Sequence, residues 1–381
     1  MRSVHPAIII GSYGWDADRL PRDEFQLRIS ELNRLMDERG WKAMLIHGDA
    51  RDHGLLAYFT NFIPRLRWAM ALVPRHGEPR LLISMSSRDM PAMKPMTWIA
   101  DVRTGWDWAG GFDQWLAGLA DEGDVGLGTI GFDVISADLF RAVERSLGNR
   151  FHLDDATPLL PRERRLRPRE LSLTRDAALA VEGAAAAILR TWRAGGGNEA
   201  AALAGEREAR AKAAQDVRTL TSLDRGLSVS PFQGRLAERV DPLLAYVAVQ
   251  DSGFWGELFV SASVRPNPLR ERAEAGLAAA LAAMVPGALA RDIFARATGA
   301  MAPYPLHPVL SASIGRRIGV SLDEGGVLQS ASDARLEPGS VYALHVGGID
   351  PAQGGAIVSA MVALTPRGAE ILCRSPSDQS G

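Results

Sequence analysis

The sequence predicts an α+β protein that is built from two domains. The chain has 381 residues, which is more than one ordinary hydrophobic core holds, and 46% of them are hydrophobic, so two cores can be filled. Helical and strand patterns alternate over residues 1–155, which indicates an α/β domain. Two alanine-rich helical segments and then a series of strands occupy residues 156–381, so the second domain is expected to consist of two helix-then-strand halves.

The N-terminal domain begins with a predicted helix over residues 23–40, because apolar residues recur there at helical spacing and Gly40 follows as a stop signal. Strands at 69–73 and 80–84 flank a turn that contains Gly77, and this pattern predicts a hairpin. The other predicted elements are strands at 43–47, 98–102, 129–133 and 151–153, and helices at 112–121 and 137–147.

The C-terminal domain begins with two predicted helices, at about 170–194 and 198–215, which are rich in strong helix formers. The glycine cluster 195–197 separates them, as glycines commonly do at helix ends. Strands are then predicted at 243–249, 257–264, 341–346 and 356–364, with one long helix at about 269–298 between the second and the third.

Composition excludes several classes of partner. The net charge is −2 and the pI is about 6.4, so there is no global basic surface for nucleic acid or an anionic membrane. The basic stretch at 161–170 is either an anion-binding patch or a solvated linker, and its lack of interleaved aromatic residues favours the linker. We therefore expect small molecules or proteins as partners.

The single cysteine, Cys373, excludes an internal disulfide framework and a thiolate metal cluster, and it favours the reducing cytoplasm. The apolar run near the start of the chain is too short for a signal peptide. No apolar run approaches the roughly 18 residues of a membrane span. A cytoplasmic protein without a membrane anchor is expected.

Several segments carry recognisable motifs. Leu336–His345 resembles the strand L-x-P-G-M-V-F-x-I-E, and Gly315–Gly319 resembles G-H-G-I-G with arginine in place of histidine. Gly355–Ser359 resembles G-x-R-I-E, and Val249–Val260, with Gly256 between, resembles the hairpin D-x-G-x4-G-Y-x3-D. These are motifs of the creatinase, prolidase and methionine aminopeptidase family, whose catalytic domain is called the pita-bread fold.

Tyr58–Phe62, followed by Arg67, resembles the N-terminal domain of creatinases and prolidases. The resemblance extends from about residue 26 to residue 373. It implies a creatinase-like domain over 1–155 and a pita-bread domain over 156–381.

The resemblance also implies where metal ligands would stand. Peptidases of the family hold two divalent metals through two aspartates, one histidine and two glutamates. Those places fall here on Val249, Val260, Arg316, His345 and Ser359. Valine has no lone pair to donate, and the positive charge of arginine repels a cation. We therefore expect no dinuclear metal centre and no cofactor.

Three residues are candidates for metal-free catalysis. His345 is either a base in the vacated pocket or a core histidine that is bonded to a neighbour. Asp251 shares a strand face with Val249, so its carboxylate either enters the pocket or faces solvent at the hairpin. Asp323 is either an orienting group for proton transfer or a loop acid.

Five residues are candidates for substrate binding: Arg316, Arg67, Phe232, Glu324 and Ser359. Arg316 either clamps an anion bidentately or forms a structural salt bridge to Asp251 or Asp323. Arg67, or its neighbour Arg65, stands where a creatinase arginine reaches into the pocket of a second subunit. Phe232 stands in place of the catalytic histidine of creatinase, which removes that proton chemistry.

Taken together, these residues predict a metal-independent hydrolase or lyase that acts on a C–N or related bond of a small anionic substrate, as a homodimer. The alternative is an inactive pseudopeptidase that serves as a binding subunit or as one half of a heterodimer. A residual single-metal site formed by His345, His307 and Asp251 is a third reading, against which the charge of Arg316 argues.

Overall fold

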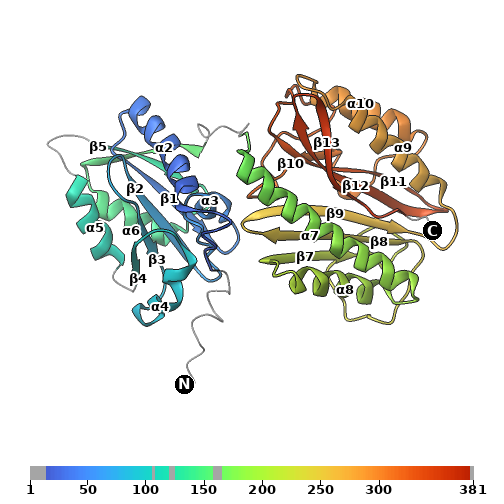
Figure 1. Ribbon diagram of the computed structural model, residues 1–381, viewed down its shortest axis with the longest axis horizontal. Helices are drawn as coiled ribbons and strands as arrows, with labels where there is room; N and C mark the ends of the chain where they lie inside the picture. Colours follow the sequence, from blue (N-terminus) through green and yellow to red (C-terminus); the bar gives the residue numbers. More distant parts are fainter. Residues whose placement is uncertain (1–13, 105–107, 120–124, 158–164, 378–381) are drawn as a thin grey trace. The chain divides into compact units, whose positions relative to one another are not determined.

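The computed structural model describes residues 14–104, 108–119, 125–157 and 165–377. It divides into two compact units, Met1–Pro161 and Arg162–Gly381 (Figure 1). The sequence placed the boundary at residue 155. Each unit has its own hydrophobic core.

A six-stranded sheet with strand order β4-β3-β2-β1-β5-β6 forms the centre of the N-terminal unit. β1 pairs antiparallel with β2 and parallel with β5, so the sheet is mixed. Its strands are β1 (Ala43–Asp49), β2 (Trp68–Pro74), β3 (Arg80–Ile83), β4 (Asp101–Thr104), β5 (Val125–Ile130) and β6 (Phe151–Asp155). The helices are α2 (Arg22–Arg39), α3 (Gly54–Thr60), α4 (Met90–Met93), α5 (Trp108–Leu119) and α6 (Ala137–Leu147), with short 3-10 turns η1 (Ser87–Asp89) and η2 (Lys94–Met96).

The strand predicted at 129–133 starts four residues later than β5, which spans Val125–Ile130. The prediction missed the first residues because Gly126 and Gly128 resemble strand breakers in the sequence. In the structure they lie within the strand and allow close packing. A Cβ added to Gly128 would lie 2.3 Å from the sulfur of Met44 and 2.6 Å from the ring of Trp41. The glycines are therefore required by the neighbouring side chains, and the strand starts at Val125.

Two antiparallel sheets and two pairs of helices make up the C-terminal unit. The first sheet is formed by β7 (Asp216–Thr221), β8 (Leu243–Asp251) and β9 (Phe254–Ala262), and the second by β10 (Gly315–Arg317), β11 (Val341–Asp350), β12 (Gly354–Thr365) and β13 (Gly368–Arg374). The helices are α7 (Pro168–Arg193), α8 (Asn198–Ala211), α9 (Pro268–Ala283) and α10 (Ala290–Met301), with a 3-10 turn η4 (Pro308–Leu310).

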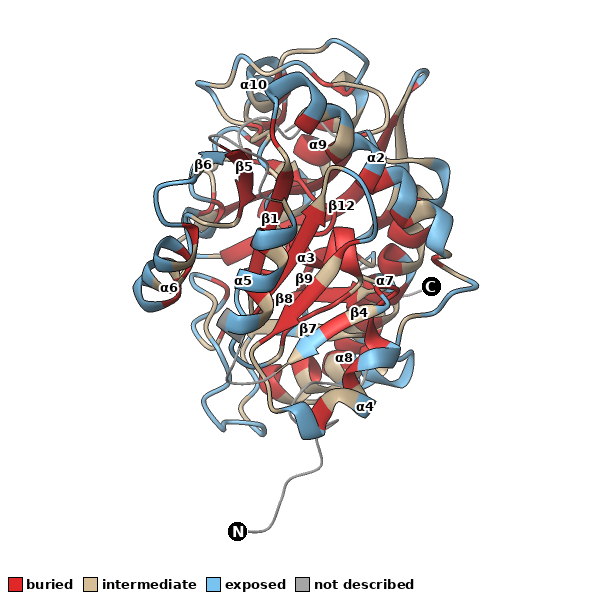
Figure 2. Ribbon diagram, turned by 90° about the vertical axis from the view of Figure 1, so that its left-hand side faces the viewer, coloured by how far each residue is buried: buried red, intermediate tan, exposed pale blue. Residues whose placement is uncertain are grey.

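Apolar side chains bury both sheets against these helices. α7 packs on β8 and β9, and α9 packs on β11 and β12. Figure 2 shows β8, β9 and β12 as buried over most of their length. The strands therefore hold their side chains in fixed positions.

The single long helix expected at 269–298 is wrong, because the structure has two helices there. α9 ends at Ala283 and α10 begins at Ala290. Pro286 cannot donate a helical hydrogen bond, and Gly287 takes a left-handed φ of +80°. The sequence Val-Pro-Gly therefore breaks the helical pattern and lets the second helix turn back along the first.

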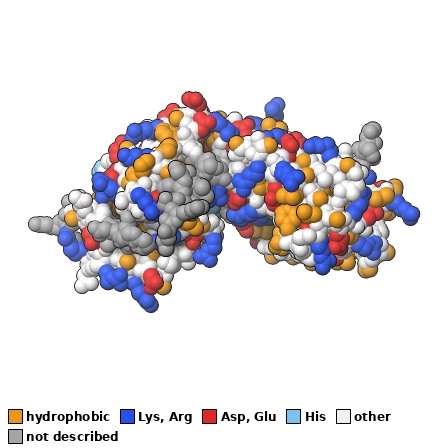
Figure 3. Space-filling model, turned by 90° about the horizontal axis from the view of Figure 1, so that it is seen from below, with side chains coloured by type: hydrophobic (Ala, Val, Ile, Leu, Met, Phe, Trp, Pro, Cys, Tyr) orange, Lys and Arg blue, Asp and Glu red, His pale blue; other side chains and the backbone are white. Residues whose placement is uncertain are grey.

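No helix among the described residues combines the length and the apolar character that a membrane span requires. On the face shown in Figure 3, acidic and basic side chains of the described residues are interspersed.

Candidate functional site

The candidate site is a buried cluster of polar side chains in the C-terminal unit, and Glu257 on β9 lies at its centre. The Tyr246 hydroxyl donates to Glu257 Oε2 at 2.5 Å. Arg316 Nη2 lies 3.0 Å from Oε1 and 3.1 Å from Oε2. His345 Nε2 lies 3.0 Å from Oε1. One carboxylate, itself 0% exposed, therefore holds three polar side chains from three different strands.

These partners keep Glu257 ionised. Burial by itself raises the pKa of the carboxyl group, but hydrogen bonding and charge from His345, the charge of Arg316 and the Tyr246 hydroxyl together bring that pKa below its ordinary value. The same contacts act in the opposite sense on Tyr246, whose pKa is raised well above its ordinary value by burial and by the Glu257 charge. At neutral pH the pair is a phenol that donates to a carboxylate.

His345 connects Glu257 to Ser359. Its Nδ1 lies 2.8 Å from Ser359 Oγ, and the two residues are directly opposite each other on β11 and β12. An ionised carboxylate can only accept, so Nε2 carries the proton that faces Glu257. In the neutral ring, Nδ1 then accepts the Ser359 hydroxyl proton. Ser359 Oγ in turn accepts from the backbone N–H of Phe259 at 2.9 Å.

Strand alternation explains why these side chains meet. On β11, Tyr342, Leu344 and Val346 pack toward α9 and α10, so His345 points to the opposite face. On β9, Leu258 and Val260 belong to the core cluster with α7, so Glu257 points away from that helix. The site lies where these two faces are turned toward each other.

Arg316 reaches the cluster from β10, at the edge of the second sheet. β10 pairs with β11, where Arg316 lies opposite Ala343. Its Nε donates to the backbone oxygen of Leu322 at 2.7 Å, and its side chain is 27% exposed. A structural salt bridge was one of the two alternatives for Arg316, and the structure forms one to Glu257 rather than to Asp251 or Asp323.

Val249 and Val260 do not lie at the site, although the resemblance in the sequence, with Gly256 as the motif glycine, assigned two of the five ligand places to them. Both are fully buried in the core cluster that includes α7, on the faces turned away from His345. The β8–β9 turn is at Ser252 and Gly253, and it places Tyr246 opposite Phe259 and Ala248 opposite Glu257.

Tyr246 and Glu257 were missed by the sequence reasoning. They are 11 positions apart, as Val249 and Val260 are, and both lie three positions earlier in the chain. When the motif glycine is matched to Gly253 instead of Gly256, both ligand places move by the same three positions, to Tyr246 and Glu257. The glycine at the hairpin turn was therefore the signal that would have found them.

The structure does not bring Asp251 and Asp323 to the cluster. Asp251 lies at the last position of β8, accepts a hydrogen bond from Ser252 and shares the strand face of Val249, which is the face turned toward α7. Asp323 is exposed and accepts from the backbone N–H of Gly325. Glu324 accepts from the backbone of Val320 and Ser321, so it stabilises its own loop.

The remaining predicted residues have separate positions. Phe232 lies in the segment between β7 and β8 and is 39% exposed. Arg67 belongs to the N-terminal unit, just before β2, with a left-handed φ of +60°. Its role in completing the pocket of a second subunit stays a prediction. His307 is buried, and both of its ring nitrogens are bonded to backbone groups.

The residues of the cluster do not fit a divalent cation. Among the described residues, no group of three or more His, Cys, Asp and Glu side chains is arranged so that it could hold a metal ion. Arg316 and His345 direct N–H groups at the carboxylate that would serve as a ligand. A cation placed there would meet a guanidinium charge and two donors instead of lone pairs.

The comparisons with known proteins agree with this fold. A family model described as "Creatinase/Prolidase N-terminal domain" matches residues 28–166, and one described as "Metallopeptidase family M24" matches residues 238–366. No curated protein matches the chain.

Solved structures with a similar fold include three Xaa-Pro peptidases. The X-Pro aminopeptidase from Thermotoga maritima has 18% identity and a TM-score of 0.77, with coverage of 92% of this chain and 98% of that chain. The prolidase from Pyrococcus horikoshii has 15% identity and a TM-score of 0.75, with 92% and 99% covered. The Xaa-Pro dipeptidase from Bacillus anthracis has 16% identity and a TM-score of 0.71, with 93% and 98% covered. Identities this low show likeness of fold.

The fold is therefore that of a two-domain protein with a pita-bread C-terminal domain. Matches to both domain families, in this order along the chain, and the likeness to prolidase structures identify the chain as a member of the creatinase/prolidase family. This confirms the fold class and the resemblance that the sequence motifs indicated.

Proposed function

We propose that this chain is a pseudopeptidase, a member of the creatinase/prolidase family that acts as a binding or partner subunit without metal-dependent peptidase activity. The observation that carries the proposal is the state of Glu257, which is fully buried and engaged at once by Tyr246, Arg316 and His345. Because Glu257 lies on the first sheet and Arg316 and His345 lie on the second, these bonds join the two sheets.

We infer that Tyr246, Glu257, Arg316, His345 and Ser359 hold the five places that metal ligands take in the family's peptidases. Within this set Arg316 supplies a positive charge next to Glu257, so a guanidinium replaces the metal as the partner of the carboxylate. Tyrosine and serine hydroxyls are poor substitutes for the carboxylates that hard divalent cations prefer. Each of the five side chains therefore has a hydrogen-bond or ionic partner within the set, without a metal ion.

The burial of the cluster favours the pseudopeptidase over the metal-free hydrolase. His345 is 3% exposed with both ring nitrogens engaged, and Ser359 is 0% exposed. A general base or a nucleophile must come within hydrogen-bond reach of a substrate. Asp251 and Asp323, the two carboxylates expected to assist His345, have other partners.

Metal analysis combined with a peptidase assay tests the loss of peptidase activity. We expect less than about a tenth of an equivalent of metal per chain, both after purification and after incubation with Mn²⁺, Co²⁺ or Zn²⁺, and no hydrolysis of Xaa-Pro dipeptides. Metal-dependent turnover would overturn the proposal. Turnover that survives a chelator and is lost in His345→Ala would instead support the metal-free hydrolase.

Mixing experiments test the partner role. The chain is analysed by sedimentation alone and together with a family member that carries two aspartates, one histidine and two glutamates at the ligand places. A mixed dimer that forms at micromolar concentration is the expected result. If both proteins sediment as they do alone, the heteromeric role is rejected, and the loss of peptidase activity still stands on its own test.

A further inference from the structure

A hollow of about 730 Å³ lies on the helix side of the C-terminal unit, between α7 and α9. This volume is in the range of small-molecule sites, which is roughly 300–1,000 Å³. α7 contributes Glu182 to its wall, α9 contributes Arg270, Glu271 and Glu274, and the end of β13 contributes Arg374. Three separate elements therefore bring charged side chains to one hollow.

The hollow is separate from the Glu257 cluster. Ser375, which lines the hollow, donates its hydroxyl to the backbone oxygen of Phe259 at 2.6 Å and accepts from the backbone N–H of Ser359 at 2.7 Å. Ser359 thus meets Ser375 through its backbone and His345 through its side chain. None of the described residues that line the hollow belongs to the cluster, so a ligand there occupies a site of its own.

Arg270 is the most firmly held charged side chain of the hollow, and it is only 13% exposed. Its Nε donates to the backbone oxygen of Ser261 at 3.2 Å, and its Nη2 donates to the backbone oxygen of Pro376 at 3.3 Å. Nη2 also lies 3.2 Å from Oε1 of Glu274. Among the described residues nothing is bonded to Nη1, so this nitrogen is available to a ligand.

Arg374 places a second guanidinium near the first. Its Nη2 lies 2.8 Å from Oε2 of Glu274, whose other oxygen is engaged by Arg270, so one carboxylate balances two positive charges. Burial lowers the pKa of Arg270, and the positive charges of Arg374 and Arg193 lower it further, while Glu274 acts against them. This half of the hollow therefore favours a ligand carboxylate, which guanidinium groups bind through paired N–H donors.

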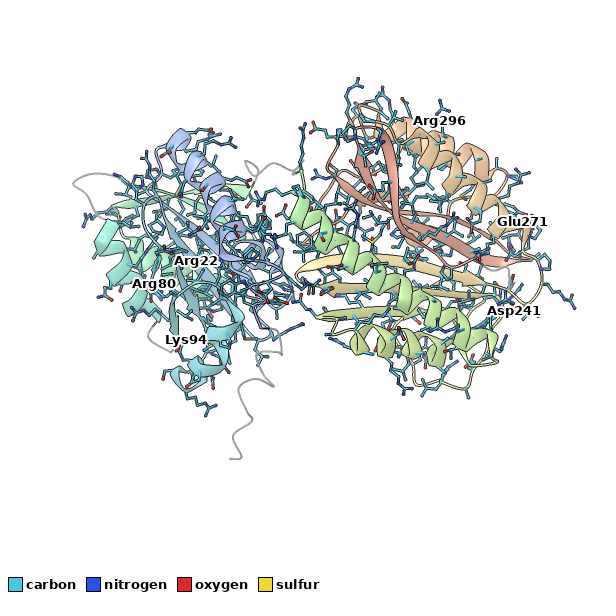
Figure 4. The ribbon with its side chains drawn as sticks, viewed as in Figure 1. Arg22, Arg80, Lys94, Asp241, Glu271 and Arg296 are labelled. Atoms are coloured by element: carbon cyan, nitrogen blue, oxygen red, sulfur yellow. The ribbon has the colours of Figure 1, made fainter. Side chains whose placement is uncertain are left out.

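Two further carboxylates line the hollow, Glu182 from α7 and Glu271 from α9. Both residues are exposed, and Figure 4 shows Glu271 projecting from its helix. Neither carboxylate is paired with a cation in the part of the chain that the structure describes. This half of the hollow therefore favours an ammonium group, which can donate up to three hydrogen bonds.

The charges of the wall select the class of ligand. The net charge of the five side chains is −1, because two arginines are accompanied by three glutamates. A simple anion would meet Glu182 and Glu271, and a simple cation would meet the two arginines. A molecule with one carboxylate and one ammonium group offers each half of the hollow the opposite charge. Amino acids and short peptides carry both groups, and a hollow of this volume has room for a short peptide.

We propose that the hollow between α7 and α9 binds the zwitterion of a short peptide or of a free amino acid. The carboxylate of the ligand binds Arg270 and Arg374, and its ammonium group binds Glu182 and Glu271. This site goes beyond the proposed function, because it lies apart from the Glu257 cluster and requires neither cleavage nor a partner subunit.

Calorimetric titration of the full chain with trialanine tests the site. Trialanine carries both end groups, N-acetyl-trialanine lacks the ammonium group, and trialanine amide lacks the carboxylate. We expect saturable binding of trialanine and about tenfold weaker binding of each blocked form, because each blocked form loses a charge-assisted contact. Alanine is titrated in parallel. Binding as tight as that of trialanine assigns the hollow to free amino acids, and weaker binding assigns it to peptides.

Two variants locate the binding. Arg374→Gln removes the more exposed guanidinium, so it should weaken trialanine binding about tenfold and abolish the difference between trialanine and its amide. The double variant Glu182→Gln, Glu271→Gln should abolish the difference between trialanine and its N-acetyl form. Arg296→Gln is the matched control, because Arg296 is exposed on α10 (Figure 4) and does not line the hollow; it should bind trialanine as the wild type does.

Three results would overturn the proposal: no saturable binding of trialanine at millimolar concentration, binding of both blocked forms as tight as that of trialanine, or unchanged binding of trialanine in Arg374→Gln. The blocked forms are compared on the wild type, so the test remains decisive if a variant does not fold. Chromatography of the titrated trialanine shows separately whether it was cleaved. Cleavage would contradict the proposed loss of peptidase activity, whereas the binding pattern decides the hollow, so the two can fail independently.

Discussion

Replacement of Glu257 by glutamine tests whether the carboxylate holds the two sheets together. Glutamine has the same shape but no charge, so Arg316 loses its ionic partner and His345 loses a charged hydrogen-bond acceptor. Removing one member of a buried ion pair costs about 3–5 kcal/mol. Because the Arg316 side chain is 27% exposed, solvent screens part of its charge, and we expect a loss of about 3 kcal/mol in the free energy of unfolding.

For a unit of this size, each kcal/mol lowers the unfolding temperature by about 2–4 °C, so the transition of the C-terminal unit should fall by about 6–12 °C. Urea titration followed by hydrogen exchange in peptides of β9 and β11 assigns the loss to this unit. Glu271→Gln is the matched control, because Glu271 projects from α9 at the surface (Figure 4) and should change stability by less than about 0.5 kcal/mol.

The pH dependence provides a second check. The pKa of Glu257 is depressed in the folded state, so its contribution is complete above the unfolded value of about 4.3 and is lost as the pH falls through the lower folded value. The difference between wild type and Glu257→Gln should therefore shrink in acid. The double variant Glu257→Leu, Arg316→Met should recover much of the lost stability, since an apolar pair has no unpaired charge. A Glu257→Gln protein within about 0.5 kcal/mol of the wild type would refute the reasoning.

Three further predictions concern other buried groups. Burial lowers the pKa of His47 and of His307 in the folded state. The free energy of unfolding should therefore be independent of these two groups above about pH 6.5, and it should fall by up to about 1.4 kcal/mol per group and pH unit as the pH drops toward the pKa of each group in the folded state. Urea titrations of His47→Gln and His307→Gln should show a weaker dependence of stability on pH than the wild type. Burial raises the pKa of Cys373 to about 12, so a thiol reagent at pH 8 should leave the native chain unlabelled and label it once in urea; native labelling would contradict this burial. Gly226→Ala should cost at least about 1–3 kcal/mol, because φ is +79° there and a Cβ would lie 2.5 Å from the oxygen of Gly355; unchanged thermal unfolding would show that the loop adapts.

Elements with complete local signals were predicted with their ends. The helix at 137–147 is an example, since Ser136 caps its first turn and Gly148 follows its last residue. The expected helix at 269–298 failed where composition hid a break, because alanines on both sides continue the helical pattern through Pro286 and Gly287. Local chemistry was sufficient where both helix ends carried a cap or a stop residue.

The sequence by itself determined the family, the two-domain order and three members of the cluster, Arg316, His345 and Ser359, because these follow from motifs read along one strand at a time. Only the tertiary structure showed that their common partner is Glu257. Side chains of a strand alternate between its two faces. An alignment error of three positions, or of any other odd number, therefore assigns residues of the buried apolar face to the face that carries the site. The turn at Ser252 and Gly253 sets that register through pairing across the hairpin, which no residue on a single strand reveals.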